Sequence, residues 1–177
     1  MKILVHICCG PCAVYPFDEL TRAGHEPTGF WYNPNIHPYR EYKQRLDALK
    51  EFEKASGLDV VYVDSYDLEE HLRRVMSDLE RRCWHCFDLR LTKTAEYARE
   101  NGFDAFTTTL LVSPYQNHEF IMDVGAKLEK EYGVEFYGTD FSPGFREGKQ
   151  KAHDMGLYMQ KYCGCIFSER DRYEKKR

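Results

Sequence analysis

The sequence opens with Lys2-Ile-Leu-Val-His-Ile7, and Cys8-Cys9-Gly10-Pro11-Cys12 follows directly. An apolar run of this length that ends at glycine and proline is typical of a buried β-strand that passes into a helix. Similar runs recur along the chain, with segments of helical periodicity between them, at residues 27–32, 60–63, 105–109 and 134–137. The pattern predicts five strands that alternate with helices.

Turn residues between these segments support the alternation. Gly24, Gly57, Gly102 and Gly133 each stand one to three residues before a predicted strand, where glycine can form the left-handed C-cap of a helix. Ser113-Pro114-Tyr115-Gln116 predicts the start of a helix, with serine as N-cap and proline at the first helical position. Short strand–helix connections favour a Rossmann-like, HUP/PP-loop-like α/β fold, in which helices cover both faces of a mostly parallel five-stranded sheet.

Length and composition restrict the class of protein. The chain has 177 residues, 42% hydrophobic and 31% charged, which predicts a single domain over 1–177, with a charged tail from about 168 that frays. A net charge of -4 excludes RNA binding by overall positive charge, so an RNA partner needs a local basic patch. No stretch reaches the roughly 18 apolar residues of a membrane-spanning helix, and no export signal is visible. These features predict a cytoplasmic protein without a membrane partner.

The cysteines are the most informative residues. Seven of them form three tight groups: Cys8, Cys9 and Cys12; Cys83 and Cys86; and Cys163 and Cys165. An odd number in a chain without an export signal argues against structural disulfides, which leaves metal binding or redox chemistry. The first group leaves the first strand at the carboxyl edge of the predicted sheet, where ligands bind in folds of this type.

Four of these cysteines suit an iron–sulfur cluster. Cys83 and Cys86 are three residues apart, so on a helical turn they face one centre together. Cys8 and Cys9 can supply the other two thiolates that a 4Fe–4S cluster takes from protein. Structural zinc is the alternative, but zinc sites usually draw on two spaced pairs, whereas Cys8 and Cys9 are adjacent. The pattern favours iron over zinc.

The remaining cysteines leave several interpretations open. Cys9-Gly10-Pro11-Cys12 matches the thioredoxin redox motif, although Cys8 and the number of predicted strands fit a thioredoxin poorly. Cys12 can face substrate, hold a further metal ion such as a second iron, or begin the helix. A disulfide between Cys163 and Cys165 would close a short, strained loop, which favours a labile two-electron couple over a metal-binding pair or two free thiols.

Four motifs together resemble a known family. They are His6-Ile-Cys-Cys-Gly-Pro-Cys12, Cys83-x-x-Cys86, Thr108-Thr-Leu-Leu-Val-Ser-Pro-Tyr-Gln-Asn117 and Tyr162-Cys-Gly-Cys165. The chain resembles, over nearly its whole length, the cobalamin-independent epoxyqueuosine reductase (QueH) family, formerly a domain of unknown function. The resemblance implies the last step of queuosine synthesis in tRNA, reduction and deoxygenation of an epoxide to a cyclopentene.

The resemblance also assigns roles to the cysteines. It implies a 4Fe–4S cluster on Cys8, Cys9, Cys83 and Cys86, and a redox-active pair at Cys163 and Cys165; the electron donor is left unidentified. The chain departs from the family at Tyr158-Met-Gln-Lys161, where the family often has an arginine after its tyrosine. A phosphate contact expected from that arginine is left to Lys161, which can act as a point charge.

The chemistry agrees with this resemblance. Removal of an epoxide oxygen as water takes two electrons and two protons; a cluster passes electrons singly, and a dithiol supplies two. A tRNA base would be flipped out and stacked on aromatic side chains. The candidate substrate contacts near the ligand edge are Trp31, Tyr32, Ser113, Tyr115 and Asn117, and the candidate basic patch is Arg81, Arg82, Arg90 and Lys93. The plainer interpretations are core or rim aromatics and a solvated helix face.

Two other functions fit parts of the sequence. A nucleotide-binding tRNA sulfur-transfer enzyme would combine a Rossmann-like sheet with paired cysteines, but its phosphate loop after the first strand is replaced here by Cys8-Cys-Gly-Pro-Cys12. Pro11 removes one amide donor from that loop, which weakens phosphate binding. A zinc-stabilised RNA-binding module is the non-catalytic alternative, and unfolding on chelation would indicate it.

Overall fold

The computed structural model describes residues 1–174 and contains one parallel sheet. Its five strands lie in the order β3-β2-β1-β4-β5, and every neighbouring pair is parallel. Their bounds are β1 Lys2–His6, β2 Glu26–Trp31, β3 Val60–Tyr62, β4 Ala105–Thr108 and β5 Glu135–Phe136. The prediction of a five-stranded parallel sheet is confirmed.

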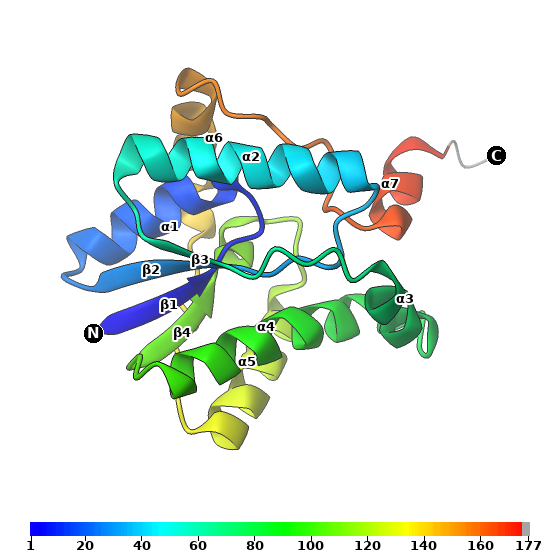
Figure 1. Cartoon of the computed structure of the whole chain (residues 1–177), viewed down its shortest axis with the longest axis horizontal. Coiled ribbons are helices and arrows are strands. Elements are labelled where there is room, and N and C mark those ends of the chain that lie inside the picture. Colours follow the sequence, from blue (N-terminus) through cyan, green and yellow to red (C-terminus); the bar gives the residue numbers. More distant parts are fainter. Residues whose placement is uncertain (175–177) are drawn as a thin grey trace.

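Seven α-helices in the described part of the chain flank this sheet. They are α1 Gly10–Arg22, α2 Tyr39–Ser56, α3 Leu68–Met76, α4 Arg82–Glu100, α5 His118–Tyr132, α6 Phe145–Asp154 and α7 Ile166–Tyr173. Figure 1 shows α1, α2 and α6 over one face of the sheet and α4 and α5 over the other. Helices therefore cover both faces, as the sequence predicts.

The central strand explains why the first residues determine the fold. Ile3, Leu4 and Val5 in β1 are fully buried, as is Ile7 directly after it. Because β1 pairs with β2 on one side and β4 on the other, both of its faces are covered by helices, and a nearly continuous apolar run suits that position. The polar exception is His6, which is also fully buried.

The first helix packs closely against the second at its N-terminus. A Cβ atom on Gly10 would lie 2.7 Å from the carbonyl oxygen of Ala48 in α2, too close for any larger residue. The left-handed glycines predicted at the helix ends are also confirmed, since Gly24, Gly57, Gly102 and Gly133 have φ angles of 81°, 71°, 69° and 67°. Gly10 thus fixes the position of the turn that carries the first three cysteines.

One predicted helix start is wrong. Helix α5 begins at His118, and its N-cap is Asn117, whose side chain accepts a hydrogen bond from the backbone N–H of Phe120 at 2.9 Å. Ser113 instead closes a local turn, because its hydroxyl accepts from the Tyr115 N–H at 3.3 Å and its carbonyl from the Gln116 N–H. Both residues are good caps, and the later one is used.

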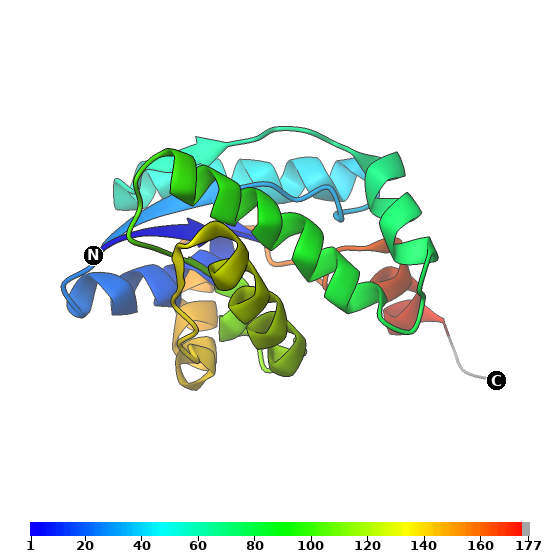
Figure 2. The same cartoon turned by 90° about the horizontal axis from the view of Figure 1, so that it is seen from below.

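The C-terminal part of the chain returns to the ligand edge. Figures 1 and 2 both place α7 beyond the ends to which the strands point, on the same side as α3. The segment expected to fray contains most of α7, and residues 175–177 lie outside the described part. No helix among the described residues is both long and apolar enough to traverse a lipid bilayer.

Candidate metal and redox site

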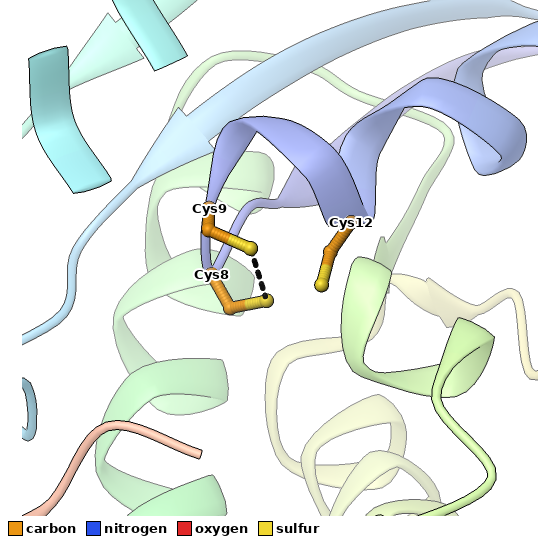
Figure 3. Close-up of side chains that lie close together, drawn as sticks. All are labelled: Cys8, Cys9 and Cys12. Carbon is orange, nitrogen blue, oxygen red and sulfur yellow. Dashed lines mark hydrogen bonds between the residues drawn. The ribbon is translucent and has the colours of Figure 1, made fainter. Parts of the chain in front are cut away.

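Three cysteines meet where β1 passes into α1. The ligand atoms of Cys8, Cys9 and Cys12 lie within 4.8 Å of one another, and the sulfurs of Cys8 and Cys9 are 3.7 Å apart. Figure 3 shows all three sulfurs converging on one point from the strand end and the first helical turn. Cys8 and Cys9 are buried, and Cys12 is half-buried. We call this set the buried sulfur group.

The buried sulfur group holds one readily ionised thiol. Hydrogen bonds from Cys12 and Cys9 hold the pKa of Cys8 well below its usual value, and the Thr109 hydroxyl adds a further bond at 3.5 Å. Burial raises the pKa of Cys9. The hydrogen bond between Cys12 and Cys8 raises the pKa of Cys12. The surroundings of Cys8 thus favour its ionised form over those of Cys9 and Cys12.

The spacing of these sulfurs suits a thiolate-bound metal. Tetrahedral coordination at a metal–sulfur distance of about 2.3 Å separates two ligands by about 3.8 Å, close to the 3.7 Å between Cys8 and Cys9. Thiolates are soft ligands that select zinc, copper(I) and iron–sulfur centres. The residues present therefore fit a metal centre at this position.

The second group of cysteines lies on α4. Cys83 is exposed and Cys86 is buried one turn later, followed after another turn by Arg90. Burial raises the pKa of Cys86 to about 12, and the charges of Cys165 and Cys163 raise it further while Arg90 opposes the rise. The start of α4 also contacts α7, because Arg82 pairs with Asp171 at 2.9 Å, and this contact brings the Cys-x-x-Cys turn towards the segment that carries the C-terminal cysteine pair.

The third group, Cys163 and Cys165, precedes α7. Cys163 is exposed, and its sulfur accepts a hydrogen bond from the Gln116 side-chain amide at 3.3 Å. Cys165 is half-buried and caps α7, because its sulfur accepts from the Ser168 N–H at 3.4 Å. All seven cysteines are free, so this pair is present as a dithiol.

Comparison with known proteins identifies the family. A model of the family described as epoxyqueuosine reductase QueH matches residues 3–171. The chain belongs to this family. It is 36% identical to the epoxyqueuosine reductase QueH of Dehalococcoides mccartyi, over 98% of this chain and 96% of that protein. It is also 36% identical to the epoxyqueuosine reductase QueH of Thermotoga maritima, over 98% of this chain and 93% of that protein. The identity to the one of Streptococcus pyogenes is again 36%, over 94% of this chain and 70% of that protein.

The four cysteines that the family resemblance assigns to a cluster come from two places in the structure. Cys8 and Cys9 belong to the group whose ligand atoms lie within 4.8 Å, together with Cys12, whereas Cys83 and Cys86 are not members of it. The positive charge of Arg90 affects the pKa of Cys86 on α4 and of His6, two residues before Cys8. Burial lowers the pKa of His6, next to Cys8 in space, to about 3, and the positive charge of Arg90 lowers it further.

The candidate substrate contacts have different surroundings. Trp31 is fully buried and donates to the Tyr42 hydroxyl at 3.2 Å, so it is a core residue rather than a stacking platform. Tyr32 is 8% exposed, whereas Tyr115 is 85% exposed and packs edge-on against Phe145. Ser113 and Asn117 form the turn and the N-cap described above, so their side-chain oxygens already accept backbone hydrogen bonds.

Of the four residues of the candidate basic patch, Arg90 does not lie on the surface. Arg90 is 1% exposed, and its Nη2 has no hydrogen-bond partner among the described residues, so it belongs to the interior and not to a surface patch. Arg81 is exposed and stacks on Trp84 at 5.1 Å. Arg82 is paired with Asp171 at 2.9 Å, and Lys93 with Glu96 at 3.1 Å.

Several residues of the site have no obvious signal in the sequence. Arg45 is 1% exposed and donates to the backbone carbonyls of Tyr162 and Cys163. Gln160 donates to the Cys12 sulfur at 3.2 Å. His71 is 1% exposed and neither ring nitrogen has a partner in the described chain. Gln116, which donates to the Cys163 sulfur, differs from these residues because it lies inside a motif that carries the family resemblance, so the sequence could have indicated it as a site residue.

Proposed function

We propose that this chain is an oxidoreductase that converts epoxyqueuosine to queuosine in tRNA. The observation that carries the proposal is the convergence of Cys8, Cys9 and Cys12 directly after β1, at the carboxyl edge of a parallel sheet, in a chain that belongs to the epoxyqueuosine reductase QueH family. Ligands bind at this edge in open α/β sheets. A nucleotide-binding sulfur-transfer enzyme is less well supported, because the turn after β1 holds thiols rather than a phosphate loop.

The proposed cofactor is a 4Fe–4S cluster held by Cys8, Cys9, Cys83 and Cys86. Each cysteine of a cubane binds a different iron, so Cys83 and Cys86 need not belong to the group within 4.8 Å, and Cys8 and Cys9 would have to move apart from 3.7 Å to bind the cluster. Helix α4, which carries Cys83 and Cys86, packs against β1, which leads into Cys8 and Cys9, and this packing supports the proximity of the two pairs. Such a cluster supplies single electrons at low potential when it is bound. Cys12 would then be free to hold a further iron ion.

Cys163 and Cys165 would supply the electron pair. Oxidation of their dithiol to a disulfide releases two electrons and two protons, which balances the loss of the epoxide oxygen as water and the formation of a carbon–carbon double bond. An external electron donor would then reduce the disulfide again. Because Cys163 is exposed, it is the member of the pair open to a partner.

The proposed substrate is a nucleotide within tRNA, flipped out of its loop. Tyr115 is the stacking candidate that remains accessible, and Arg81 next to Trp84 is a cationic and aromatic surface near Cys83. With a net charge of -4, the chain depends on such local contacts rather than on a general positive field.

One experiment tests the function directly. Protein purified without oxygen is reconstituted with iron and sulfide and incubated with epoxyqueuosine-containing tRNA and a low-potential reductant. The expected product nucleoside has lost the mass of one oxygen, and the protein holds about four irons from the cluster per chain, or about five if Cys12 binds its own ion. Unchanged nucleoside from a fully loaded protein would contradict the proposal.

Two matched variants separate the roles of the cysteines. Cys83→Ser should lose both the brown colour and turnover, because it removes a cluster ligand. Cys165→Ser should keep the colour and lose turnover, because it removes half of the electron pair. Loss of colour in both variants would instead indicate that the C-terminal pair binds metal.

The buried sulfur group also supports a second candidate. Its 3.7 Å spacing suits one tetrahedral zinc ion, as in a zinc-stabilised RNA-binding module. Colourless protein with a single zinc, which unfolds on chelation and binds tRNA equally well after Cys163→Ser, would establish that module and exclude the reductase.

A further inference from the structure

The loop that carries Cys163 and Cys165 belongs to no helix or strand. It lies between the end of α6 at Asp154 and the start of α7 at Ile166. Regular backbone hydrogen bonding therefore does not fix its position relative to the sheet. Its place must come from contacts with other parts of the chain.

Those contacts converge on the start of α2. The backbone N–H of His37 donates to the Gly164 carbonyl at 2.8 Å, and the Tyr162 hydroxyl donates to the His37 carbonyl at 2.6 Å. The N–H of Ile166 donates to Nδ1 of His37 at 3.4 Å. His37 thus contacts the loop on both sides of the cysteine pair.

Arg45, two turns into α2, makes the strongest of the loop contacts. Its Nη1 donates to the carbonyl of Cys163 at 2.7 Å, and its Nη2 donates to the carbonyl of Tyr162 at 2.8 Å. Its Nε donates to Oε1 of Glu41 at 2.7 Å. All three nitrogens of a guanidinium that is 1% exposed are therefore used.

This arrangement requires arginine rather than any cation. The planar fork of a guanidinium can reach two successive carbonyls and a carboxylate at once, whereas a lysine ammonium is a single point. The other oxygen of Glu41 accepts from the Tyr158 hydroxyl at 2.7 Å, so the buried ion pair is satisfied on both sides. Full pairing of this kind is what offsets the cost of burying two charges.

The loop also fits closely over the guanidinium. A Cβ atom on Gly164 would lie 3.2 Å from Nη1 of Arg45, and the φ angle of Gly164 is +145°, which favours glycine. The Tyr162 ring lies over the Arg45 guanidinium with 5.6 Å between them. The middle residue of the Cys-Gly-Cys sequence is thus shaped to pack on Arg45.

The loop held by Arg45 also contacts the buried sulfur group, because the Gln160 side-chain amide donates to the Cys12 sulfur at 3.2 Å. Burial raises the pKa of Cys9, and the positive charge of Arg45 opposes that rise. One side chain therefore contacts the loop of the third cysteine group and lies within electrostatic range of the first.

We propose that Arg45 is a positioning residue that fixes the Cys163–Cys165 pair relative to the buried sulfur group. It acts through the two backbone carbonyls it binds, and it contacts neither cysteine sulfur. The kinetic part of this inference rests on the proposed reductase function; the structural part does not.

The test compares Arg45→Lys with Arg40→Lys, an exposed residue on the same helix. Lysine keeps the charge beside Glu41 and loses the fork. The first measurement is the alkylation rate of Cys165 in the protein as isolated, followed by peptide mass and compared between variants at equal protein and reagent concentrations. We expect Cys165 to react about tenfold faster in Arg45→Lys, because loss of a charged hydrogen bond permits local opening of the loop. Arg40→Lys should react like the wild type.

The second measurement is steady-state turnover of the iron-loaded enzyme. We expect kcat to fall roughly tenfold or more, with KM within about twofold, because the electron pair is displaced while the substrate site is intact. Iron content should be unchanged. If Arg45→Lys does not fold, Tyr158→Phe removes only the outer support of Glu41 and should raise Cys165 alkylation by about two- to threefold.

The outcomes separate the two proposals. Unchanged Cys165 alkylation in a folded Arg45→Lys protein, or in Tyr158→Phe if Arg45→Lys does not fold, overturns the positioning role. Faster alkylation, in a protein whose wild type leaves epoxyqueuosine unreduced, supports the positioning role and overturns the reductase function. Loss of iron from Arg45→Lys would overturn the inference, because Arg45 would then support the metal site itself.

Discussion

The buried sulfur group and the Cys163–Cys165 loop bring thiols to the same edge of the sheet by opposite means. Cys8, Cys9 and Cys12 are placed by neighbouring residues, through the end of β1 and the first turn of α1. Cys163 and Cys165 are placed by α2, more than a hundred residues earlier in the sequence, through Arg45 and His37. Two of the three cysteines in the first group are buried, as suits a metal ligand set, whereas the second group is more open, as suits the proposed exchange of electrons with a partner.

If the buried sulfur group holds the metal and the Cys163–Cys165 loop does not, the largest difference between variants of the two groups should be in metal affinity. Cys8→Ser should lower the affinity of the chain for its metal by more than about 100-fold, since even residues that only support a ligand contribute 10–100-fold. Cys163→Ser should change it by less than about threefold. Competition with a chromophoric chelator measures both variants. Equal losses would mean that the two sulfur groups form one ligand set.

The packing of α1 against α2 gives the next largest effect. Gly10→Ala places a Cβ 2.7 Å from a backbone oxygen of α2, and backbone cannot move aside cheaply. We expect a loss of about 2–3 kcal/mol in the free energy of unfolding. Gly57→Ala is the matched control: it has open space but a φ of +71°, and should cost about 1 kcal/mol. Urea denaturation compares them, and a reversed order would show that the helices adjust to the extra methyl group.

The same contrast explains what could be predicted from sequence. The strands and the glycine caps depend on residues close in sequence, so composition and spacing reveal them. The sequence left the role of Cys12 open, and the structure places its sulfur with those of Cys8 and Cys9. The start of α5 was predicted wrongly because Ser113 and Asn117 both carry the chemistry of an N-cap, and local pattern does not choose between them. Local signals identify an element more reliably than its boundary.

The buried arginines show where sequence fails. Glu41 and Arg45 are four residues apart, a spacing that ordinarily indicates an exposed ion pair on a helix. Their burial results from contact with Tyr158 and the Cys163 loop, which no local pattern predicts. Arg90 was likewise expected on the surface and is buried beside the cysteines of α4. Charged residues become interior only through tertiary contacts.

Acid should weaken the region that supports the loop. His71 packs edge-on against His37 at 5.2 Å, and burial lowers the pKa of His71 from 6.5 to about 3. Below pH 6.5 the unfolded chain binds a proton that the folded chain does not, so stability falls with pH until about pH 3. Between pH 7 and 5 this site should cost about 2 kcal/mol.

The variant His71→Phe should remove this share of the pH dependence. Phenylalanine fills similar space, and neither ring nitrogen of His71 has a partner to lose among the described residues. His153→Phe, at an exposed position, is the control for the replacement of a histidine by phenylalanine. Urea titrations at pH 7 and pH 5 give the difference. An unchanged slope in His71→Phe would mean that His71 is protonated in the folded state.

The smallest effect on global stability is expected at the loop itself. Gly164→Ala forces a Cβ onto a φ of +145° and to within 3.2 Å of Arg45, a local strain of about 1–3 kcal/mol. Because Gly164 lies in a loop outside the helices and strands, the loop should open locally rather than transmit this strain, and the free energy of global unfolding should change by less than about 1 kcal/mol. Hydrogen exchange at Gly164–Ile166 should accelerate by about tenfold while β1 is unaffected. A large global loss would show instead that the loop is as integral to the core as the turn at Gly10, and the contrast between the two sulfur groups would not hold.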